Sequence, residues 1–272
     1  MNRSKPWRHL VLFPLACVFA LPMILLLSGS LKTNEQLSRN PHAVVPAEPT
    51  VENYSEATRA MPIGRYFYNS LVLCFGCVIG TTFSCSLIAY SLARIKWGGR
   101  KWVWTSVIMS LLIPWHVTMI PRFMLLSQAG LYNSLWAIIL PTFLGDAFYI
   151  FLLRQFFLTL PDDLFEAGQI DGMNHWQQFC RIAVPLSVPA LVTVALFKFI
   201  EVWNDFGSPL LYLNDPDKFP LAYGLERFVS SYADQTNLLL AAAVLFTIPI
   251  VILFFLAQRT FIQGISTTGI KG

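Results

Sequence analysis

Long apolar stretches separated by polar segments run along the whole chain. A helix rises 1.5 Å per residue, so roughly 20 apolar residues cross a bilayer core of about 30 Å. Stretches near this length are expected to form membrane helices at 10–27, 68–93, 102–121, 134–157, 187–213 and 238–257. The pattern predicts an all-α, polytopic membrane protein with six transmembrane helices, forming a single domain over 1–272.

The polar segments indicate how these helices are oriented. Six spans place both termini on the same side of the membrane. The segments on that side carry more Lys and Arg than the opposite ones, which favours the cytoplasm. We therefore expect an extracytoplasmic loop with short helical pieces at 32–67, a cytoplasmic loop at 158–186 and a cytoplasmic tail at 258–272.

The first apolar stretch has a competing interpretation. Arg3, Lys5 and Arg8 precede it, as they would precede a cleavable signal peptide. The apolar part of a signal peptide is usually only about 7–15 residues long and ends at a small-residue cleavage site. The stretch 10–27 is longer and no clear site of that kind follows, so a retained membrane helix is favoured.

Prolines and a glycine interrupt two of the stretches. Pro114 and Pro121 are expected to kink the third span, and 122–133 is expected to be a short outer loop. The fourth span is expected to be interrupted near Pro141 and Gly145.

Composition places the chain outside the range of soluble domains. Hydrophobic residues make up 55% of the 272 residues, and the mean hydropathy is +0.56. The net charge of +4 is modest, and no basic run with interleaved aromatic residues stands outside the membrane boundaries. Lipid is thus the expected surrounding, and no nucleic acid is expected as a partner. The four His residues are scattered without metal-ligand spacing, so no metal site is expected.

Small residues recur at helical spacing in the second span. Gly76, Gly80 and Ser84 form a small-xxx-small row, a pattern that permits close helix packing in lipid. Cys74 and Cys77 lie beside this row in a C-x-x-C spacing. Without a βαβ context a redox pair is the weaker interpretation, and small packing residues are the stronger one.

The most polar segment of the second half is expected to form two short helices. Pro161 suits a first helical position, and Asp162 and Asp163 in the first turn suit the helix dipole. Gly172 is a natural end for this helix. Its apolar face is expected to hold Leu160, Leu164, Ala167 and Gly168.

The second helix is expected to begin at Asn174, with Gln177 placed for a capping box. Its apolar face is expected to hold Trp176, Phe179, Cys180 and Ala183. An alternative is a helix pair lying on lipid, which favours a basic polar face. Residues 160–180 contain four acidic residues and no Lys or Arg, so a protein partner is favoured.

This segment also resembles a known family. Its sequence resembles the EAA loop of permease subunits of binding-protein-dependent ABC importers, through Glu166-Ala167-Gly168, Asp171-Gly172, Ile182, Pro185 and Pro189. Other stretches are similar to the sugar-importing members of that family, namely 151–157, Trp203-Asn204-Asp205, Gln258-Arg259-x-Phe261-x-x-Gly264 and 269–272.

The resemblance implies a cytoplasmic coupling helix between the fourth and fifth spans. Glu166, Ala167 and Gly168 would lie in a cleft of an ATPase subunit, and Asp171 and Gly172 would form the closing turn. It also implies a second, non-identical permease, two ATPase subunits that hold ATP and Mg²⁺, an extracytoplasmic solute-binding protein and a sugar substrate. The chain contains no G-x-x-x-x-G-K-[ST] motif, so we expect no cofactor and no ATPase site within it.

Ionisable residues within the spans are candidates for a translocation path, because charge inside a membrane is costly. The candidates are Asp146, Lys198, Glu201, Asn204 and Asp205. Lys198 and Glu201 are three residues apart and can pair, and Glu201 and Asp205 are expected on the same helix face. A Lys198–Glu201 pair that only fixes helix register is the alternative to a role in transport.

Two other classes of function remain open at this stage. A secondary transporter driven by an ion gradient would use Asp146, Glu201 or Asp205 as its proton or ion site. The sequence shows no inverted repeat, which disfavours that class. A membrane scaffold without transport activity would leave the charges within the spans unexplained.

Overall fold

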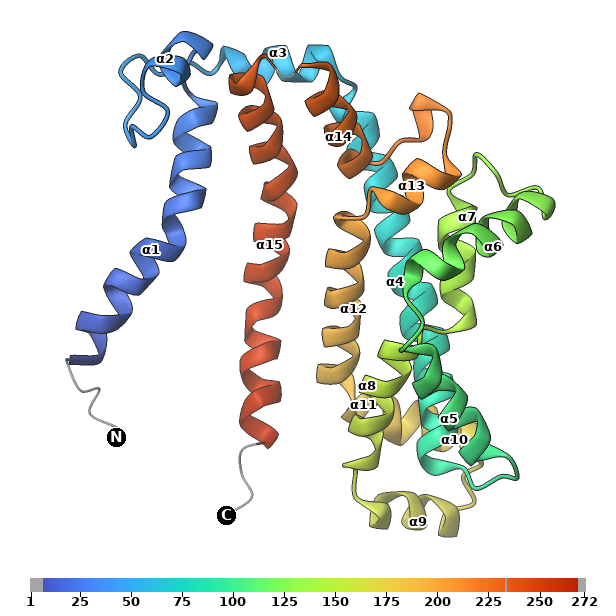
Figure 1. Cartoon of the computed structure of the whole chain (residues 1–272). Helices are drawn as coiled ribbons and strands as arrows, with labels where there is room; N and C mark the ends of the chain where they lie inside the picture. The colour runs from blue at the N-terminus through green and yellow to red at the C-terminus, as the bar shows by residue number, and fades with distance from the viewer. Residues whose placement is uncertain (1–6, 233, 269–272) are drawn as a thin grey trace. The chain divides into compact units, whose positions relative to one another are not determined.

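The computed structural model describes residues 7–232 and 234–268, and throughout these residues the regular secondary structure is helical (Figure 1). Side chains are described for 10–232 and 234–256. Arg3, Lys5, the side chain of Arg8 and the side chains of the tail 258–272 therefore lie outside the described part. The expected all-α class is confirmed.

The expected spans correspond to four helical stretches and two bent pairs. Helical stretches long and apolar enough to cross a membrane are Leu10–Ser30, Ile63–Arg94, Trp136–Leu158 and Thr236–Leu256. Two further candidates arise if each bent pair counts as one span, namely Arg100–Ser110 with Trp115–Gln128 and His175–Leu186 with Val188–Trp203. The chain is thus a multi-pass membrane protein, and the count of six spans stays a prediction.

The chain divides into two compact units. The first comprises the segment up to Gly64 together with Gly224–Val251. Its helices are α1 (Trp7–Ser30), α2 (Asn34–Arg39), α3 (Glu52–Ala60), most of α14 (Leu221–Ser231) and the first part of α15 (Thr236–Thr268).

Buried polar side chains hold the first unit together. The amide of Asn53 donates to the backbone oxygens of Ser30 and Lys32, at 2.8 Å each, and its oxygen accepts from the Asn237 amide at 2.8 Å. The Lys32 ammonium donates to the backbone oxygen of Ala43 at 2.6 Å. The segment expected as a loop at 32–67 does contain short helices, but α4 already begins within it.

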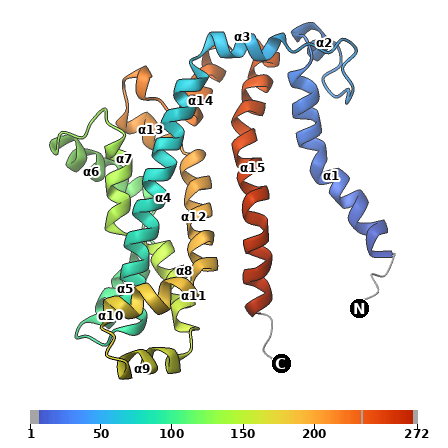
Figure 2. The same ribbon diagram turned by 180° about the vertical axis from the view of Figure 1, so that it is seen from behind.

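The second unit comprises Arg65–Tyr223 and the chain from Ile252 onward. Its elements are α4 (Ile63–Arg94), α5 (Arg100–Ser110), α6 (Trp115–Gln128), α7 (Trp136–Ile139), the 3-10 helix η1 (Leu140–Leu144), α8 (Ala147–Leu158), α9 (Asp162–Ile170), α10 (His175–Gln178), the π-helical turn η2 (Phe179–Ala183), α11 (Val184–Leu186), α12 (Val188–Trp203), α13 (Gly207–Tyr212) and the 3-10 helix η3 (Pro216–Lys218). Figure 2 shows α4 running along the length of this unit.

The row of small residues on α4 packs closely, as predicted, and its partners are α7 and η1. A Cβ atom on Gly76 would lie 2.9 Å from the Ile139 side chain, and one on Gly80 would lie 2.3 Å from Thr142 Oγ1. The Ser84 hydroxyl donates to the Thr142 backbone oxygen at 2.9 Å. The absence of larger side chains therefore sets how closely these helices approach.

The third expected span is broken, and the expected outer loop after it is partly helical. The chain turns by 106° between α5 and α6. Pro114 caps α6 in an extended conformation, and the residue before a proline avoids the helical region, so the break falls here. Pro121 lies inside α6, which continues to Gln128. The prediction of a loop over 122–133 is therefore wrong for its first half.

The fourth expected span is interrupted where predicted. Gly145 adopts a φ of 95°, which ends η1, and the Asp146 carboxylate then accepts the Phe148 N–H at 3.0 Å to cap α8. A Cβ atom on Gly145 would lie 2.8 Å from Ile88, so both the conformation and the packing favour glycine.

The fifth expected span ends earlier than its apolar pattern suggests. Helix α12 ends at Trp203, and 207–212 form the separate helix α13. Asn204 donates its side-chain amide to the Ile200 oxygen at 2.7 Å, and Asp205 accepts the Ser208 N–H at 3.0 Å. Short polar side chains compete in this way with helix continuation. Asp205 therefore lies outside the helix face that was predicted to carry it with Glu201.

Candidate functional site: a polar pocket and a folded loop

The acidic loop forms two helices joined by a tight turn, as the sequence predicts. Gly172 has a φ of 79°. Its N–H donates to the Gln169 backbone oxygen at 3.0 Å, and the Met173 N–H donates to the Gly168 backbone oxygen at 2.8 Å. This is the Schellman pattern that ends a helix. At the second helix, Asn174 and Gln177 form the expected capping box, with both bonds at 2.9 Å.

The buried face of α9 differs from the predicted one. Phe165 and Gly168 are buried, whereas Leu164 is 43% exposed and Ala167 is also exposed. A Cβ atom on Gly168 would lie 3.0 Å from Ile182, so this glycine packs within the loop. Gly168 is therefore on the inner face, opposite the contact surface expected for it.

The predicted face of the second helix also needs correction. Phe179 and Ala183 are buried as expected, but Trp176 is 58% exposed and Cys180 is exposed. The π-helical turn over Phe179–Ala183 changes the residue spacing, so a face drawn at α-helical spacing fails there. Gln178 takes the inner position instead and is 2% exposed.

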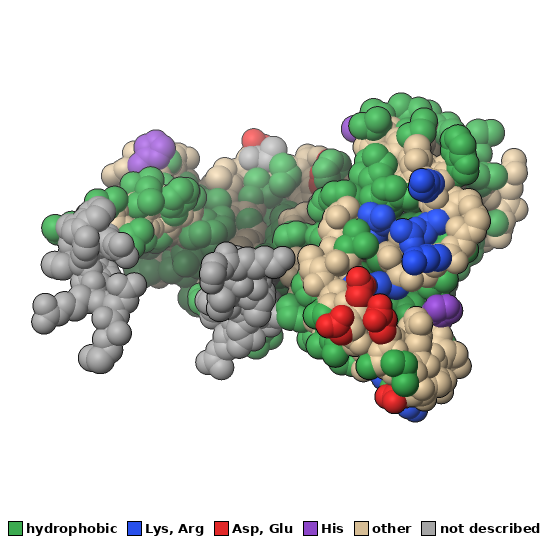
Figure 3. Space-filling model, turned by 90° about the horizontal axis from the view of Figure 1, so that it is seen from below, with side chains coloured by type: hydrophobic (Ala, Val, Ile, Leu, Met, Phe, Trp, Pro, Cys, Tyr) green, Lys and Arg blue, Asp and Glu red, His purple; other side chains and the backbone are tan. Residues whose placement is uncertain are grey.

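The outer face of α9 is acidic with apolar residues among the charges. Asp162, Asp163 and Glu166 are exposed, and Ile170 at the end of the helix is 86% exposed. Figure 3 shows acidic side chains gathered on this face beside a group of Lys and Arg side chains. Acidic and apolar groups presented together are suited to contact with a protein.

Arg94 at the end of α4 holds this loop, and sequence reasoning assigned it only to a basic segment. Its guanidinium donates to the backbone oxygens of Phe157 and Leu160 and to the Asp162 carboxylate. The same group lies 4.5 Å from the centre of the Phe165 ring. The sequence did offer one signal: Arg94 directly follows an apolar span, and the acidic loop is expected on the same side of the membrane.

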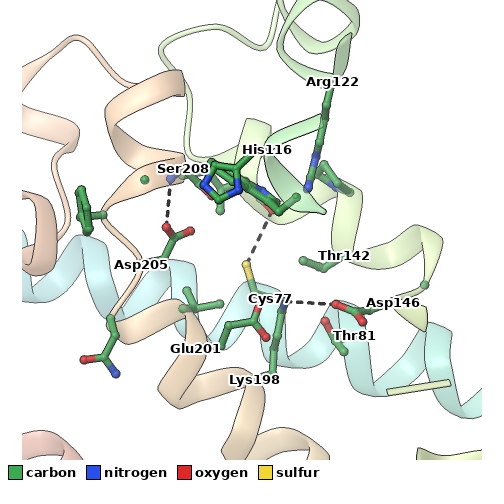
Figure 4. Close-up of a pocket in the computed structure, with 18 residues that line it drawn as sticks. Cys77, Thr81, His116, Arg122, Thr142, Asp146, Lys198, Glu201, Asp205 and Ser208 are labelled. Carbon is green, nitrogen blue, oxygen red and sulfur yellow. Dashed lines mark hydrogen bonds and ion pairs between the residues drawn. The ribbon is translucent and has the colours of Figure 1, made fainter. Parts of the chain in front are cut away.

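The five residues predicted for the translocation path line one pocket of about 670 Å³ (Figure 4). They come from the start of α8, from α12 and from the turn after α12: Asp146, Lys198, Glu201, Asn204 and Asp205. The sequence predicted these residues as candidates for one path, and the structure brings all five together.

Lys198 is the centre of the charges in this pocket. Its ammonium lies 2.8 Å from Glu201 Oε1, as the predicted pair requires, and 3.7 Å from Asp146 Oδ2. The Tyr149 hydroxyl donates to Glu201 Oε2 at 2.8 Å. Only 8% of the Lys198 side chain is exposed, so the two carboxylates are needed to offset part of the cost of its lost hydration.

Other pocket residues were missed by sequence reasoning. Trp115, His116 and Arg122 of α6 line the pocket, as do Cys77 and Thr81 of α4. Arg122 had been assigned to the outer loop, and the helix break at Pro114 is what brings α6 to the pocket. The lining combines hydrogen-bond donors, carboxylate acceptors and an indole ring, which suits a solute rich in hydroxyl groups.

These features define a class of protein: a helical, multi-pass membrane protein with a charged pocket beside broken helices and a folded acidic loop. The chain belongs to the family described as binding-protein-dependent transport system inner membrane component, whose model matches residues 85–267. The resemblance drawn from the loop is confirmed. Membership also favours an importer over the transporter driven by an ion gradient.

Two relatives and one solved structure match nearly the whole chain. The arabinooligosaccharides transport system permease protein AraQ of Halalkalibacterium halodurans is 32% identical over 261 residues, covering 95% of this chain and 93% of the relative. The diacetylchitobiose uptake system permease protein NgcG of Streptomyces coelicolor is 30% identical over 262 residues, covering 95% and 86%. A chain of a bacterial ABC transporter involved in the import of the acidic polysaccharide alginate has a TM-score of 0.79 at 22% identity, covering 95% of this chain and 98% of that one, and so shares its fold.

Proposed function

We propose that this chain is a permease subunit of an ATP-driven carbohydrate importer. The observation that carries the proposal is the acidic loop, which is folded, anchored on its inner face and exposed on its outer face. The names of the relatives, which refer to arabinooligosaccharide transport and diacetylchitobiose uptake, support a sugar as the solute.

The loop is the docking element for an ATPase subunit in this proposal. Glu166 and Ala167 on the outer face of α9 contact the partner, and exposed Ile170 supplies an apolar anchor. Asp171 and Gly172 close the helix, and Gly168 lets α9 pack closely on the segment behind it. Both ATPase subunits hold ATP with Mg²⁺, so the chemical step takes place outside this chain.

The pocket is this subunit's share of the translocation path. Asp146, Glu201 and Asp205 accept hydrogen bonds from sugar hydroxyls, Asn204 both donates and accepts, and Lys198 holds the Asp146 and Glu201 carboxylates in place. A second permease completes the path, and an extracytoplasmic solute-binding protein delivers the sugar. Six spans with both termini in the cytoplasm place the loop on the side where ATP is available.

Purification of the native complex tests this function. The chain, isolated from membranes under mild detergent, should retain ATPase subunits, a second permease and a sugar identifiable by mass spectrometry. Uptake of that sugar should depend on ATP and should persist after ionophores collapse the ion gradients. A chain that carries no ATPase subunit, or uptake that stops with the gradients, would overturn the proposal.

A further inference from the structure

Arg94 bonds to both sides of the joint between α8 and α9. Its Nε and Nη2 atoms donate to the Phe157 oxygen in the last turn of α8 at 3.0 and 2.6 Å, and Nη2 also donates to the oxygen of Leu160, which lies between the two helices. On the α9 side, Nη1 pairs with the Asp162 carboxylate. Residues 159–161 form the joint between α8 and α9, and the Arg94 side chain of α4 therefore bonds on both sides of it.

The chemistry of this contact requires a guanidinium group. Carbonyl oxygens at the end of α8 carry the negative end of the helix dipole, which favours a cation. Only arginine offers several N–H donors in a fixed plane, enough for two carbonyl oxygens and one carboxylate at once. The side chain is 10% exposed, so little water competes for these donors.

Tyr90, one turn before Arg94, secures the inner side of the same loop. Its ring centre lies 5.2 Å from that of Phe179 and 6.4 Å from that of Phe165. Buried Gln178, whose amide donates to the Phe165 oxygen at 3.3 Å, lies within 3.5 Å of the Tyr90 hydroxyl. The last turn of α4 thus contacts both helices of the loop.

The other part of α4 reaches the pocket. The backbone N–H of Asp146 donates to the Cys85 sulfur at 3.2 Å, and the same thiol lies 3.6 Å from the backbone oxygen of Asp146. Cys77 and Thr81 line the pocket directly. Helix α4 is continuous over Ile63–Arg94, whereas α12 is separated from the loop by a 77° bend. If the loop displaces the end of α4, the pocket residues on the same unbroken helix are therefore displaced with it.

We propose that Arg94 is a positioning residue that locks the joint between α8 and α9 onto α4. A displacement of α9 by the ATPase then moves α4 and α8 together, and so changes the pocket around Asp146. This inference rests on the proposed function, since it needs an ATPase at the loop. Without the guanidinium, α9 can turn about 159–161 while the bundle stays in place.

The complete transporter, reconstituted in liposomes, tests this proposal through the number of ATP molecules hydrolysed per sugar imported. Arg94→Gln should retain the ATPase subunits at wild-type stoichiometry but raise that ratio about fivefold or more, the low end for coupling between distant sites. Arg94→Lys should recover part of the loss, because it keeps the charge without the planar donors. Arg154→Gln is the matched control, since Arg154 donates to the Leu92 oxygen near the end of α4 at 3.2 Å and stacks on Trp104 of α5.

A wild-type ratio in Arg94→Gln, or an equal rise in Arg154→Gln, would overturn the proposal. If Arg94→Gln does not accumulate, Arg94→Lys and Asp162→Asn decide the question, because each keeps part of the contact. Both should then raise the ratio, and a wild-type ratio in both would overturn the role of Arg94. Failure of the proposed function is distinguishable, because the wild-type chain itself would then bind no ATPase.

Discussion

The Lys198 ammonium in α12 lies 3.7 Å from the Asp146 carboxylate at the start of α8. This contact joins two helices that are separated in sequence by the whole acidic loop. Because Glu201 lies 2.8 Å from the same ammonium, one buried cation holds two carboxylates at the pocket.

Replacing Lys198 by Met should destabilise the subunit, because Asp146 and Glu201 would then face each other without a cation. Both carboxylates are partly exposed, so the loss should be about 1–3 kcal/mol, below the roughly 3–5 kcal/mol for a fully buried pair. The measurement is the thermal unfolding midpoint of the purified transporter in detergent. The double change Lys198→Met with Glu201→Gln should recover part of the loss, and an unchanged midpoint in the single variant would contradict the pairing.

Replacing Gly80 by Ala should also lower stability. The added Cβ atom would lie 2.3 Å from Thr142 Oγ1 and 2.8 Å from the Phe143 ring, and overpacking of this kind costs about 1–3 kcal/mol. Gly64→Ala is the control on the same helix, because nothing lies within 4 Å of its Cβ position. The unfolding midpoint should fall only for Gly80→Ala. Equal midpoints would mean that α4 and η1 do not approach as closely as described.

Replacing Gly172 by Ala should reduce transport more than it reduces stability. Its φ of 79° costs an L-residue about 1–2 kcal/mol, and nothing else opposes the new methyl group. Gly130→Ala is the matched control, with a φ of 74° and equally open surroundings. Both variants should unfold at similar temperatures, but only Gly172→Ala should slow ATP-dependent uptake, since it loosens the end of α9. Equal uptake in the two variants would argue against a role for that turn.

Local signals were enough to predict the parts of the site that depend on neighbours in sequence. The end of α9 at Gly172, the capping box at Asn174 and the Lys198–Glu201 pair all join residues a few positions apart. The interruption near Gly145 was likewise predictable, because glycine favours a positive φ.

Contacts between distant segments were not predictable in this way. The inner face of α9 depends on Ile182, which lies in η2 and packs against Gly168. Arg94 and Arg122 are separated from their sites by entire helices, and hydropathy alone places both in loops. Asp205 was misplaced because an apolar stretch does not show that Asn204 and Asp205 end a helix and begin another.

Site-specific cross-linking from the outer face of α9 tests whether the loop docks on an ATPase subunit. Glu166→Cys, made in a Cys180→Ser background to remove the exposed thiol of the loop, should cross-link to the ATPase subunit through a short bismaleimide. Glu226→Cys on α14 is the control, at a position that is also exposed. We expect an ATPase adduct from Glu166→Cys alone, with a yield that changes when ATP is added. No adduct from that position, or the same yield from Glu226→Cys, would show that α9 does not dock on the ATPase subunit.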